Sequence, residues 1–263
     1  MECYCQLKIK KNIFTIMIKN IIRKIKKKYS ILVNKGNKVY CPICESRYKI
    51  FGNFGNPKRI NAQCYKCNSL ERHRLLWMYI NNKTDFFNNF SKKLLHFAPE
   101  FSFYQIFSNI NFIDYYPCDI SLEKYKYKGN VKIHKIDITQ IPFDDNYFDV
   151  IICNHVLEHI TDDRLAIQEL YRVLKQDGWA YLQVPIEENR EITFEDNTII
   201  SIKDRKNIFG QSDHIRIYGK DYKNRLESVG LEVTRDNYIN SFSDNEIYKY
   251  GLMKDEYIYL AKK

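Results

Sequence analysis

The feature that most constrains the fold is an alternation of strand-like and helix-like patterns from Lys93 to the end of the chain. Seven apolar runs have the length of strands, namely KLLHFA, FIDYYPC, VKIHKI, FDVIIC, WAYLQVP, LEVTRDNYI and EYIYLAKK. Helical patterns fall at about residues 100–109, 161–175 and 220–229. Such alternation predicts an α/β protein with a doubly wound, mostly parallel sheet. Ligands of these sheets bind beyond the carboxyl ends of the strands.

Three stretches in this region carry a family resemblance. They are CDIS (Cys118 to Ser121), DITQIPFDDNYFDVIICNHVLEHI (Asp137 to Ile160) and ELYRVLKQDGWAYLQVP (Glu169 to Pro185). In this order and spacing they resemble class I S-adenosylmethionine-dependent methyltransferases, over roughly residues 93–263. The resemblance implies a seven-stranded Rossmann-like sheet and S-adenosylmethionine as cofactor.

The same resemblance assigns cofactor contacts. Asp119, closing the second strand, would accept both ribose hydroxyls. Asp137, after the third strand, would accept from the adenine amine, and Ile138 would offer its backbone N–H to the ring. Asn154 and His155, just past the fourth strand, would line the rim of the cofactor and substrate sites. A common alternative for an aspartate such as Asp119 is to initiate a turn.

The first strand and its turn, LLHFAPE, depart from the family pattern because they contain no glycine. His96 stands where an acid is usual and Ala98 where the first glycine is usual. Alanine preserves a close approach to the cofactor but makes a positive φ costly. Pro99 suits the first turn of a helix, and Glu100 either caps that helix or binds the ammonium group of the cofactor. We therefore expect a remodelled cofactor loop.

Two Cys-x-x-Cys pairs, CPIC and CYKC, are separated by nineteen residues. Two such turns complete a tetrahedral site of four sulfurs, formed by Cys41, Cys44, Cys64 and Cys67. The spacing predicts a structural zinc ribbon, with two disulfides, a redox pair and a rubredoxin-like iron site as alternatives. A zinc ribbon followed by LLHFAPE resembles a branch of these methyltransferases that acts on small molecules or glycans and is associated with polysaccharide loci.

The positive charge is concentrated at the N-terminus. The first 40 residues hold 11 Lys and Arg and one acidic residue, which accounts for the whole net charge of +10 and leaves residues 41–263 neutral. In residues 1–38 apolar side chains recur at spacings of three and four among lysines, as in a basic amphipathic helix. This helix either packs on its own domain or, through residues 8–33, contacts an anionic membrane surface or a partner.

We expect a cytoplasmic protein with reduced thiols, peripheral at a membrane if the N-terminal helix docks there. Uncharged apolar runs stay well below the roughly 18 residues of a membrane span, and no cleavage site follows the first apolar segment. The expected divisions of the chain are a basic helix (1–38), a zinc-ribbon-like module (39–68), a linking helix (69–92) and a methyltransferase domain (93–263), with an insertion that covers the acceptor (186–219).

Two histidine-containing stretches remain. HVLEH matches a zinc-protease pattern, but it directly follows a buried strand; we expect Glu158 and His159 to hold the loop by hydrogen bonds. In GQSDHIRIYG, within the insertion, the side chains of Asp213, His214, Arg216 and Tyr218 offer a carboxylate, a base, an anion contact and a phenol. His214 is a candidate general base, and Asp213, Tyr218 and His155 are further catalytic candidates. Alternatively, His214 and Tyr218 only fix the loop, beside a polar stretch that acts as a mobile lid.

The leading hypothesis is transfer of a methyl group from S-adenosylmethionine to a small molecule or glycan precursor. Such chemistry needs mainly position and orientation from the protein, so the acceptor is poorly encoded in the sequence. An RNA methyltransferase with a zinc-ribbon contact is one alternative, although the neutral body argues against a broad RNA-binding surface. A non-catalytic cofactor-binding or scaffold protein is another. The sequence does not indicate an oligomeric state.

Overall fold

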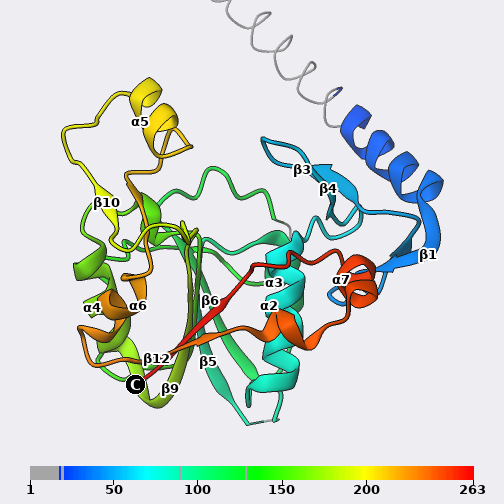
Figure 1. Cartoon of the computed structure of the whole chain (residues 1–263). Helices are drawn as coiled ribbons and strands as arrows, with labels where there is room; N and C mark the ends of the chain where they lie inside the picture. The colour runs from blue at the N-terminus through cyan, green and yellow to red at the C-terminus, as the bar shows by residue number, and fades with distance from the viewer. Residues whose placement is uncertain (1–17, 19–20, 89, 128) are drawn as a thin grey trace, which may run out of the picture. The chain divides into compact units, whose positions relative to one another are not determined.

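The computed structural model describes residue 18 and residues 21–263, except residues 89 and 128 (Figure 1). The chain divides into two compact units that do not follow sequence order. One contains the described residues up to Met78 together with Phe242–Lys254, and the other contains Tyr79–Ser241 and Asp255–Lys263. The expected contiguous domain 93–263 is therefore interrupted. The expected linking helix is α2 (Glu71–Lys83), which is shorter than 69–92 and spans the boundary between the units.

The second unit contains the predicted seven-stranded sheet. Its strands are β5 (Lys92–Phe97), β6 (Ile113–Asp119), β7 (His134–Lys135), β8 (Phe148–Asn154), β9 (Leu174–Gln183), β12 (Glu232–Asp236) and β13 (Ile258–Lys262). Their spatial order is β12-β13-β9-β8-β5-β6-β7. β13 is antiparallel to both neighbours, and the ladders from β9 through β8, β5 and β6 to β7 are parallel. The fold is that of the Rossmann-like methyltransferases.

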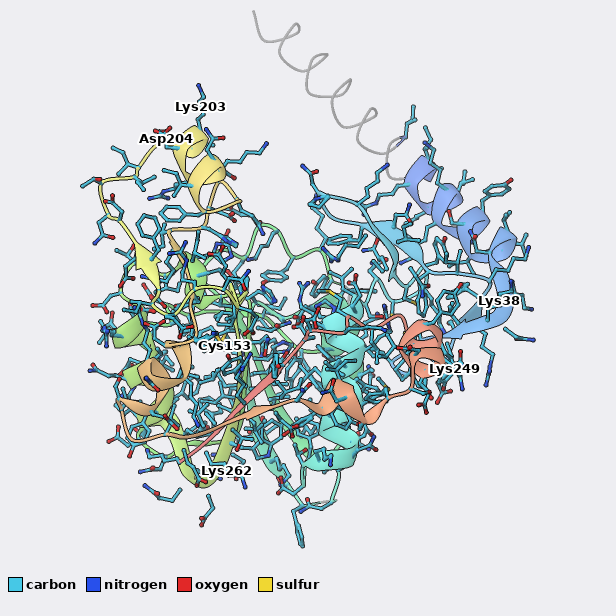
Figure 2. The ribbon with its side chains drawn as sticks, viewed as in Figure 1. Lys38, Cys153, Lys203, Asp204, Lys249 and Lys262 are labelled. Carbon is cyan, nitrogen blue, oxygen red and sulfur yellow. The ribbon has the colours of Figure 1, made fainter. Side chains whose placement is uncertain are left out.

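The central strands are buried along nearly their whole length, which explains their continuous apolar sequences. In β8 all residues except Asp149 are buried, and Cys153 lies in the interior of the sheet (Figure 2). Cys153 is 1% exposed and packs as a small buried hydrophobe. β5 runs two residues beyond Leu95, so that His96 and Phe97 belong to the strand and only Ala98 begins the turn.

Helices cover both faces of this sheet (Figure 1). α3 (Phe101–Phe107) lies against β6 on one face, and α4 (Asp163–Val173) and α6 (Tyr222–Glu227) lie on the other. The amphipathic pattern of α4 explains its orientation: Ala166, Ile167 and Leu170 are buried in the core. Two 3₁₀ turns, η1 (Leu157–His159) and η2 (Tyr238–Ser241), complete the unit together with the insertion.

The insertion contains more regular structure than its polar sequence suggested. It forms β10 (Phe194–Glu195), α5 (Ile202–Ile208) and β11 (Arg216–Ile217), and β10 pairs antiparallel with β11. The side chain of Ser201 accepts a hydrogen bond from the backbone N–H of Asp204, which starts α5. No residue of α5 is buried, and Figure 2 shows Lys203 and Asp204 at its outer side.

The first unit contains the cysteine module. Its elements are β1 (Lys35–Tyr40), β2 (Arg47–Tyr48), β3 (Gly52–Phe54), β4 (Arg59–Gln63), the beginning of α2, and α7 (Asp244–Tyr250). β1 pairs with β2 and β3 with β4, both antiparallel, as expected of a ribbon. The guanidinium of Arg74 on α2 is fully buried and donates hydrogen bonds to the carbonyl groups of Ala62, Ser69, Tyr250 and Gly251.

The N-terminal helix ends earlier than expected. Residues 21–33 are helical, and residues 35–38, assigned to the helix from sequence, belong to β1. Asn34 ends the helix, because both its backbone N–H and its side-chain amide donate to the carbonyl group of Ser30. The rest of the predicted helix, residues 1–17, 19 and 20, lies outside the described residues. Within the described chain, none of the helices is both long and apolar enough to span a bilayer.

Candidate cofactor and acceptor site

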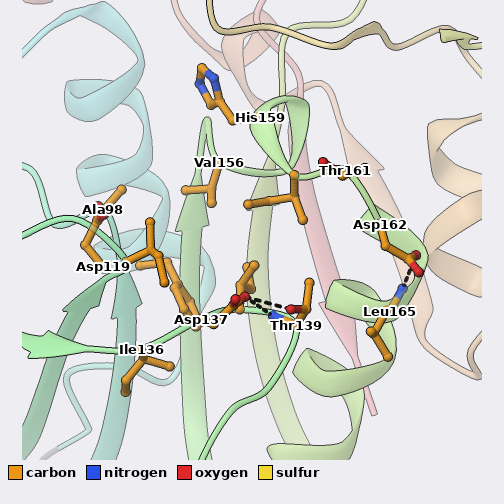
Figure 3. A pocket seen from close by; sticks show the side chains of 14 residues that line it. Ala98, Asp119, Ile136, Asp137, Thr139, Val156, His159, Thr161, Asp162 and Leu165 are labelled. Carbon is orange, nitrogen blue, oxygen red and sulfur yellow. Dashed lines mark hydrogen bonds between the residues drawn. The ribbon is translucent and has the colours of Figure 1, made fainter. Parts of the chain in front are cut away.

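A cavity of about 400 Å³ opens at the carboxyl ends of the parallel strands in the second unit (Figure 3). At this edge the chain runs from β5 outward to β7 and then returns to the other side of β5 at β8, the switch point where such sheets bind ligands. The cavity is lined by fourteen residues: Phe97, Ala98, Asp119, Ile120, Ile136, Asp137, Ile138, Thr139, Val156, His159, Ile160, Thr161, Asp162 and Leu165.

Asp119 is the last residue of β6, and its carboxylate is 7% exposed at the cavity wall. Oδ1 accepts a hydrogen bond from the backbone N–H of Ser121, so the turn that was the alternative role of this aspartate is present. Oδ2 accepts from the hydroxyl of Tyr125 at 2.5 Å and lies 2.7 Å from Nζ of Lys124. A ligand hydroxyl would therefore meet an acceptor that is already oriented.

Asp137 and Ile138 follow β7. Oδ1 of Asp137 accepts hydrogen bonds from the backbone N–H and the hydroxyl of Thr139, as the dashed lines in Figure 3 show. Ile138 is buried with its side chain at the cavity wall, and none of the described residues accepts a hydrogen bond from its backbone N–H. The arrangement presents one fixed carboxylate and one backbone donor side by side.

The turn after β5 places Ala98 in the left-handed region, with φ of 49°. Ala98 lines the cavity, as expected of the residue in the place of the first glycine. Glu100 precedes α3 but makes no side-chain cap there. Its carboxylate lies instead between two buried side chains: Oε2 is 3.0 Å from Nε2 of His96, and Oε1 accepts a hydrogen bond from the amide of Asn154.

His96 and Asn154 thus support Glu100, and none of these three residues lines the cavity. His96 is fully buried, and its other ring nitrogen is 2.9 Å from the hydroxyl of Tyr115. Asn154 is 4% exposed, and its Oδ1 has no hydrogen-bond partner among the described residues. The structure therefore brings three of the predicted cofactor residues together as one polar group at the ends of β5 and β8.

His155 begins the loop after β8, with φ of 54°. Its Nδ1 lies 3.1 Å from Oε1 of Glu158, which is 1% exposed. Burial alone would raise the pKa of the Glu158 carboxyl, but the hydrogen bond from His155 and the neighbouring imidazoles lower the pKa overall. Glu158 is therefore a buried carboxylate in its ionised form.

Hydrogen bonds join HVLEH to the insertion, a link that the sequence did not predict. Nδ1 of His159 is 3.1 Å from the carbonyl oxygen of Asp213, and the backbone N–H of Ile215 donates to the carbonyl group of Glu158. His214 is 7% exposed, and its ring centroid lies 4.8 Å from that of His159. Burial lowers the pKa of the His214 imidazole, which favours its neutral form.

The other two predicted groups of the insertion lie in the protein interior. The guanidinium of Arg216 is 2% exposed and donates to the carbonyl groups of Leu157, Ile160 and Thr161, so it is not available as the anion contact expected from sequence. Tyr218 is fully buried, and its hydroxyl donates to Asp163 at 2.6 Å. Neither side chain lines the cavity.

The four cysteines of the first unit form one cluster, with their sulfur atoms within 4.8 Å of one another. The shortest distances are 3.5 Å between Cys44 and Cys64 and 3.6 Å between Cys41 and Cys67. The two halves are equivalent in backbone geometry. The N–H of Cys41 donates to the carbonyl group of Ser46, and that of Cys64 donates to the carbonyl group of Ser69.

In each half the residue after the second cysteine, Glu45 or Asn68, has a positive φ of 58° or 60°. Two equivalent turns that converge four thiols fit a tetrahedral zinc site. A zinc ion with four thiolates carries a formal charge of about −2. Arg74 would compensate part of this charge, because it bonds to Ser69, whose hydroxyl is 3.3 Å from the sulfur of Cys41 and 3.2 Å from that of Cys67.

Sequence reasoning missed several residues of the site. Tyr125 and Lys124, which hold Asp119, lie in the segment LEKYKYK, where alternating lysines and tyrosines gave no sign of a cofactor loop. Val156, Ile160 and Leu165 form part of the cavity wall. Their apolar character is shared with the core, so only the tertiary structure separates cavity lining from core packing.

Comparisons with known proteins agree with this geometry. Residues 97–182 match the model of the family described as "Methyltransferase domain". The chain is 43% identical over 49 residues to the uncharacterized methyltransferase YcgJ of Bacillus subtilis. It is 44% identical over 50 residues to the ubiquinone/menaquinone biosynthesis C-methyltransferase UbiE of Idiomarina loihiensis. These matches cover 19% of this chain and 19% and 20% of the two relatives, so the chain spans about a fifth of the length of each.

The fold also resembles solved structures. The [4+2]-cyclase SpnF superimposes with a TM-score of 0.50 at 14% identity, over 91% of this chain and 92% of that one. Residues 97–182 thus match the methyltransferase-domain family and lie within a seven-stranded, mostly parallel sheet.

Proposed function

We propose that this protein transfers the methyl group of S-adenosylmethionine to a small-molecule or glycan-precursor acceptor. The observation that carries the proposal is that Asp119, Asp137, Ile138 and Ala98 line one cavity at the switch point of the sheet. The fold alone does not suffice, because SpnF shares it and is named as a cyclase. The proposed function is therefore supported by the residues of the site and not by the fold.

In the proposed complex each of these groups has one task, and Glu100 joins them from beside the cavity. The carboxylate of Asp119, oriented by Tyr125, would accept the ribose hydroxyls. The carboxylate of Asp137 would accept from the adenine amine, and the backbone N–H of Ile138 would donate to the ring. Glu100, held by His96 and Asn154, would bind the ammonium group of the cofactor from the end of β5.

Methyl transfer is an in-line displacement at a sulfonium carbon. An acceptor lone pair forms a bond to the methyl carbon while the carbon–sulfur bond breaks and sulfur keeps its electron pair. The cofactor supplies the reactivity, and the protein supplies position and, for a hydroxyl acceptor, a site for the proton. The imidazoles of His155, His159 and His214 surround Glu158 beside the cavity and form the acceptor side in this proposal.

Two observations support a small-molecule or glycan acceptor at a membrane surface. The body of the chain is neutral, which gives no field for broad RNA binding. The helix of residues 21–33 carries its net positive charge beside apolar side chains that are exposed in the first unit: Ile21, Ile22, Ile25, Tyr29, Leu32 and Val33. A basic helix with an uncovered apolar face fits an anionic lipid surface and hence a lipid-linked acceptor.

We also propose that Cys41, Cys44, Cys64 and Cys67 hold a structural Zn²⁺. The two equivalent turns and the compensating Arg74 support this assignment. A module of this size buries too little apolar surface to fold by itself, so the ion would stabilise the ribbon directly.

The proposal is tested by isothermal titration of the zinc-loaded full chain with S-adenosylmethionine and S-adenosylhomocysteine. Both are expected to bind, and Asp137→Ala is expected to weaken binding by at least about tenfold, as is Glu100→Gln, each removing one charge-assisted contact. Asp144→Ala is the matched control, because Asp144 is an exposed aspartate of the same region that does not line the cavity.

If the wild-type chain binds neither compound, the enzyme proposal falls and a non-catalytic scaffold role takes its place. A transfer assay with a tritiated methyl group then identifies the acceptor among nucleotide sugars, lipid-linked glycans and RNA. Labelling of RNA alone, with binding that weakens as salt rises, would replace the proposed acceptor by the RNA alternative.

A further inference from the structure

Glu158, His159 and His214 form a second group of metal-ligand side chains, separate from the cysteines. One ligand atom from each residue lies within 4.8 Å of those of the other two. Glu158 and His159 come from η1, directly after β8, and His214 comes from the insertion, more than fifty residues later. Of the three residues, His159 lines the cavity and is labelled in Figure 3.

Glu158 is not satisfied by the protein. The residue is 1% exposed, and its Oε2 has no hydrogen-bond partner among the described residues. Its Oε1 is 3.1 Å from Nδ1 of His155 and 4.0 Å from Nε2 of His159. A buried carboxylate oxygen without a partner is costly, so a further positive group is expected next to it.

His159 is oriented as metal-binding histidines are. A carbonyl oxygen only accepts hydrogen bonds, so the contact of Nδ1 with the carbonyl group of Asp213 places the proton on Nδ1. Nε2, the other ring nitrogen, lies 4.0 Å from Oε1 of Glu158 and is the atom that would bind an ion placed between them. Metal-bound histidines characteristically donate the other N–H to a backbone carbonyl or a carboxylate.

His214 completes the group. It is 7% exposed, and its ring forms no hydrogen bond with any described residue. Its contact with His159 is edge to face, with the ring centroids 4.8 Å apart. One of its ring nitrogens lies within 4.8 Å of the ligand atoms of Glu158 and His159, so it is available as a third ligand.

We infer that Glu158, His159 and His214 bind a first-row divalent metal ion such as Zn²⁺ beside the cofactor cavity. Two imidazoles and one carboxylate are a donor set of catalytic sites, which keep further positions open for water or substrate. In a tetrahedral site the ligand atoms are about 3.4 Å apart, given metal–ligand distances near 2.1 Å. Binding would therefore shorten the distances between ligand atoms, now up to 4.8 Å, by as much as about 1.4 Å, within the reach of side-chain rotation.

On the proposed function, this ion identifies the acceptor class as one with a hydroxyl group. A divalent ion lowers the pKa of a hydroxyl that it binds, so the proton is lost to water at neutral pH. The oxygen lone pair then attacks the methyl carbon, and sulfur retains the electron pair of the broken bond. His214 would act as a ligand in this arrangement and not as the general base. The acceptor class rests on the proposed function, whereas the metal site does not.

The test measures metal stoichiometry on the full chain. Protein purified without chelators is dialysed against Zn²⁺, and bound metal is determined by elemental analysis. The wild-type chain is expected to bind two ions, one at the cysteines and one at the new site, whereas His159→Gln and His214→Gln are each expected to bind one. His134→Gln is the control, because His134 is a half-buried histidine of β7 that does not line the cavity.

Two further measurements separate loss of a ligand from loss of the fold. Excess Zn²⁺ should raise the melting temperature of the wild-type chain but not that of His214→Gln. His214→Asp, which supplies a carboxylate oxygen in place of the imidazole nitrogen, should regain the second ion. One ion per chain in the wild type, or two in both glutamine variants, would overturn the site.

Failure of this site and failure of the proposed function are distinguishable. Binding of S-adenosylmethionine with only one zinc ion per chain overturns the metal site and leaves the methyltransferase proposal intact. A second ion lost in the histidine variants, without any binding of S-adenosylmethionine, supports the metal site and removes the methyltransferase proposal.

Discussion

At Ala98 the backbone takes a conformation that alanine disfavours. Its φ of 49° lies in the left-handed region, where a Cβ atom costs about 1 kcal/mol. The residue lines the cavity and follows the strand that ends at the switch point. The turn therefore keeps the path that glycine usually takes, and the missing glycines are not a sign of a lost site. The strain is of the kind that folded proteins keep at functional positions.

The positive φ of residue 98 predicts that two substitutions there have different effects. Ala98→Gly relieves the strain and should leave the free energy of unfolding and the affinity for S-adenosylmethionine nearly unchanged, because relief in the folded state offsets the greater entropy of the unfolded chain. Ala98→Val places a β-branched residue at positive φ and should cost about 2 kcal/mol and about tenfold in affinity. Urea unfolding and isothermal titration measure the two quantities. Equal behaviour of the two variants would contradict the proposed path of the turn.

At the connection between α4 and β9, the structure differs from what the sequence pattern indicates. The sequence RVLKQDG indicates a helix that ends with a left-handed Gly178, but the positive φ of 63° belongs to Asp177. α4 already ends at Val173, and Gly178 lies inside β9. A Cβ at Gly178 would approach the carbonyl oxygens of Lys175 and Asp149 to 2.9 and 3.0 Å. Glycine is required there by close approach of the backbone and not by φ.

Among the elements, η1 and the insertion depend on each other. Arg216 of β11 donates to three carbonyl groups of the η1 loop, and His159 contacts Asp213. Glu195 of β10 accepts from Arg216 at 2.9 Å and from Arg225 of α6 at 3.2 Å. These ion pairs link the β10–β11 hairpin to the core. The sequence predicted a loop that covers the acceptor, but not that buried arginines would anchor it.

Glu195 should make the stability of the hairpin pH-dependent. Burial alone would raise the pKa of its carboxyl, but hydrogen bonds from Arg225 and Arg216 bring the pKa below its ordinary value of 4.5. Near pH 4 the unfolded state therefore binds more protons than the folded state, so the contribution of Glu195 is complete above about pH 5 and is lost as the pH falls through the lowered pKa.

Acid unfolding of Glu195→Gln beside the wild type measures this contribution. The difference between their free energies of unfolding should be largest at neutral pH and should shrink below about pH 4. Glu191→Gln is the control, since the side chain of Glu191 is 75% exposed in its pair with Lys220. A difference that stays constant between pH 7 and pH 3 would show that the ion pairs of Glu195 do not stabilise the fold.

At the scale of the whole molecule, charge and apolar exposure coincide at the N-terminus. The first 40 residues carry the entire net charge of +10, and the helix of residues 21–33 leaves Ile25, Tyr29 and Leu32 at least 60% exposed. Each basic residue at an anionic surface contributes about 1 kcal/mol, and each buried apolar side chain adds to it. The two features together favour binding to anionic lipid.

Sedimentation with vesicles tests this interpretation. The full chain should bind phosphatidylglycerol vesicles and not phosphatidylcholine vesicles, and binding should weaken as salt rises. The triple change Ile21→Ser, Ile25→Ser and Leu32→Ser should reduce binding by at least about tenfold, because it removes three apolar side chains from the lipid contact. Ile60→Ser, at an isoleucine that is 73% exposed in β4, is the control. Undiminished binding of the triple variant would exclude the helix as the lipid contact.

The sequence by itself determined the sheet architecture, because apolar strands that alternate with amphipathic helices are compatible with few other folds. It also determined the cysteine module, where ligand spacing is local, and it indicated Asp119, Asp137 and Ala98, because each follows directly on a strand. A local sequence pattern predicts the position of a residue when the residues that it contacts are close to it in the sequence.

Only the tertiary structure decided what depends on distant segments. It showed that Glu100 lies between His96 and Asn154. It also showed that Arg216 and Tyr218 are buried, and that Phe242–Lys254 belongs to the first unit. It also brought His214 to Glu158 and His159. Such contacts are set by how the sheet and the insertion close in three dimensions, and a local pattern carries no information about a partner fifty or more residues away.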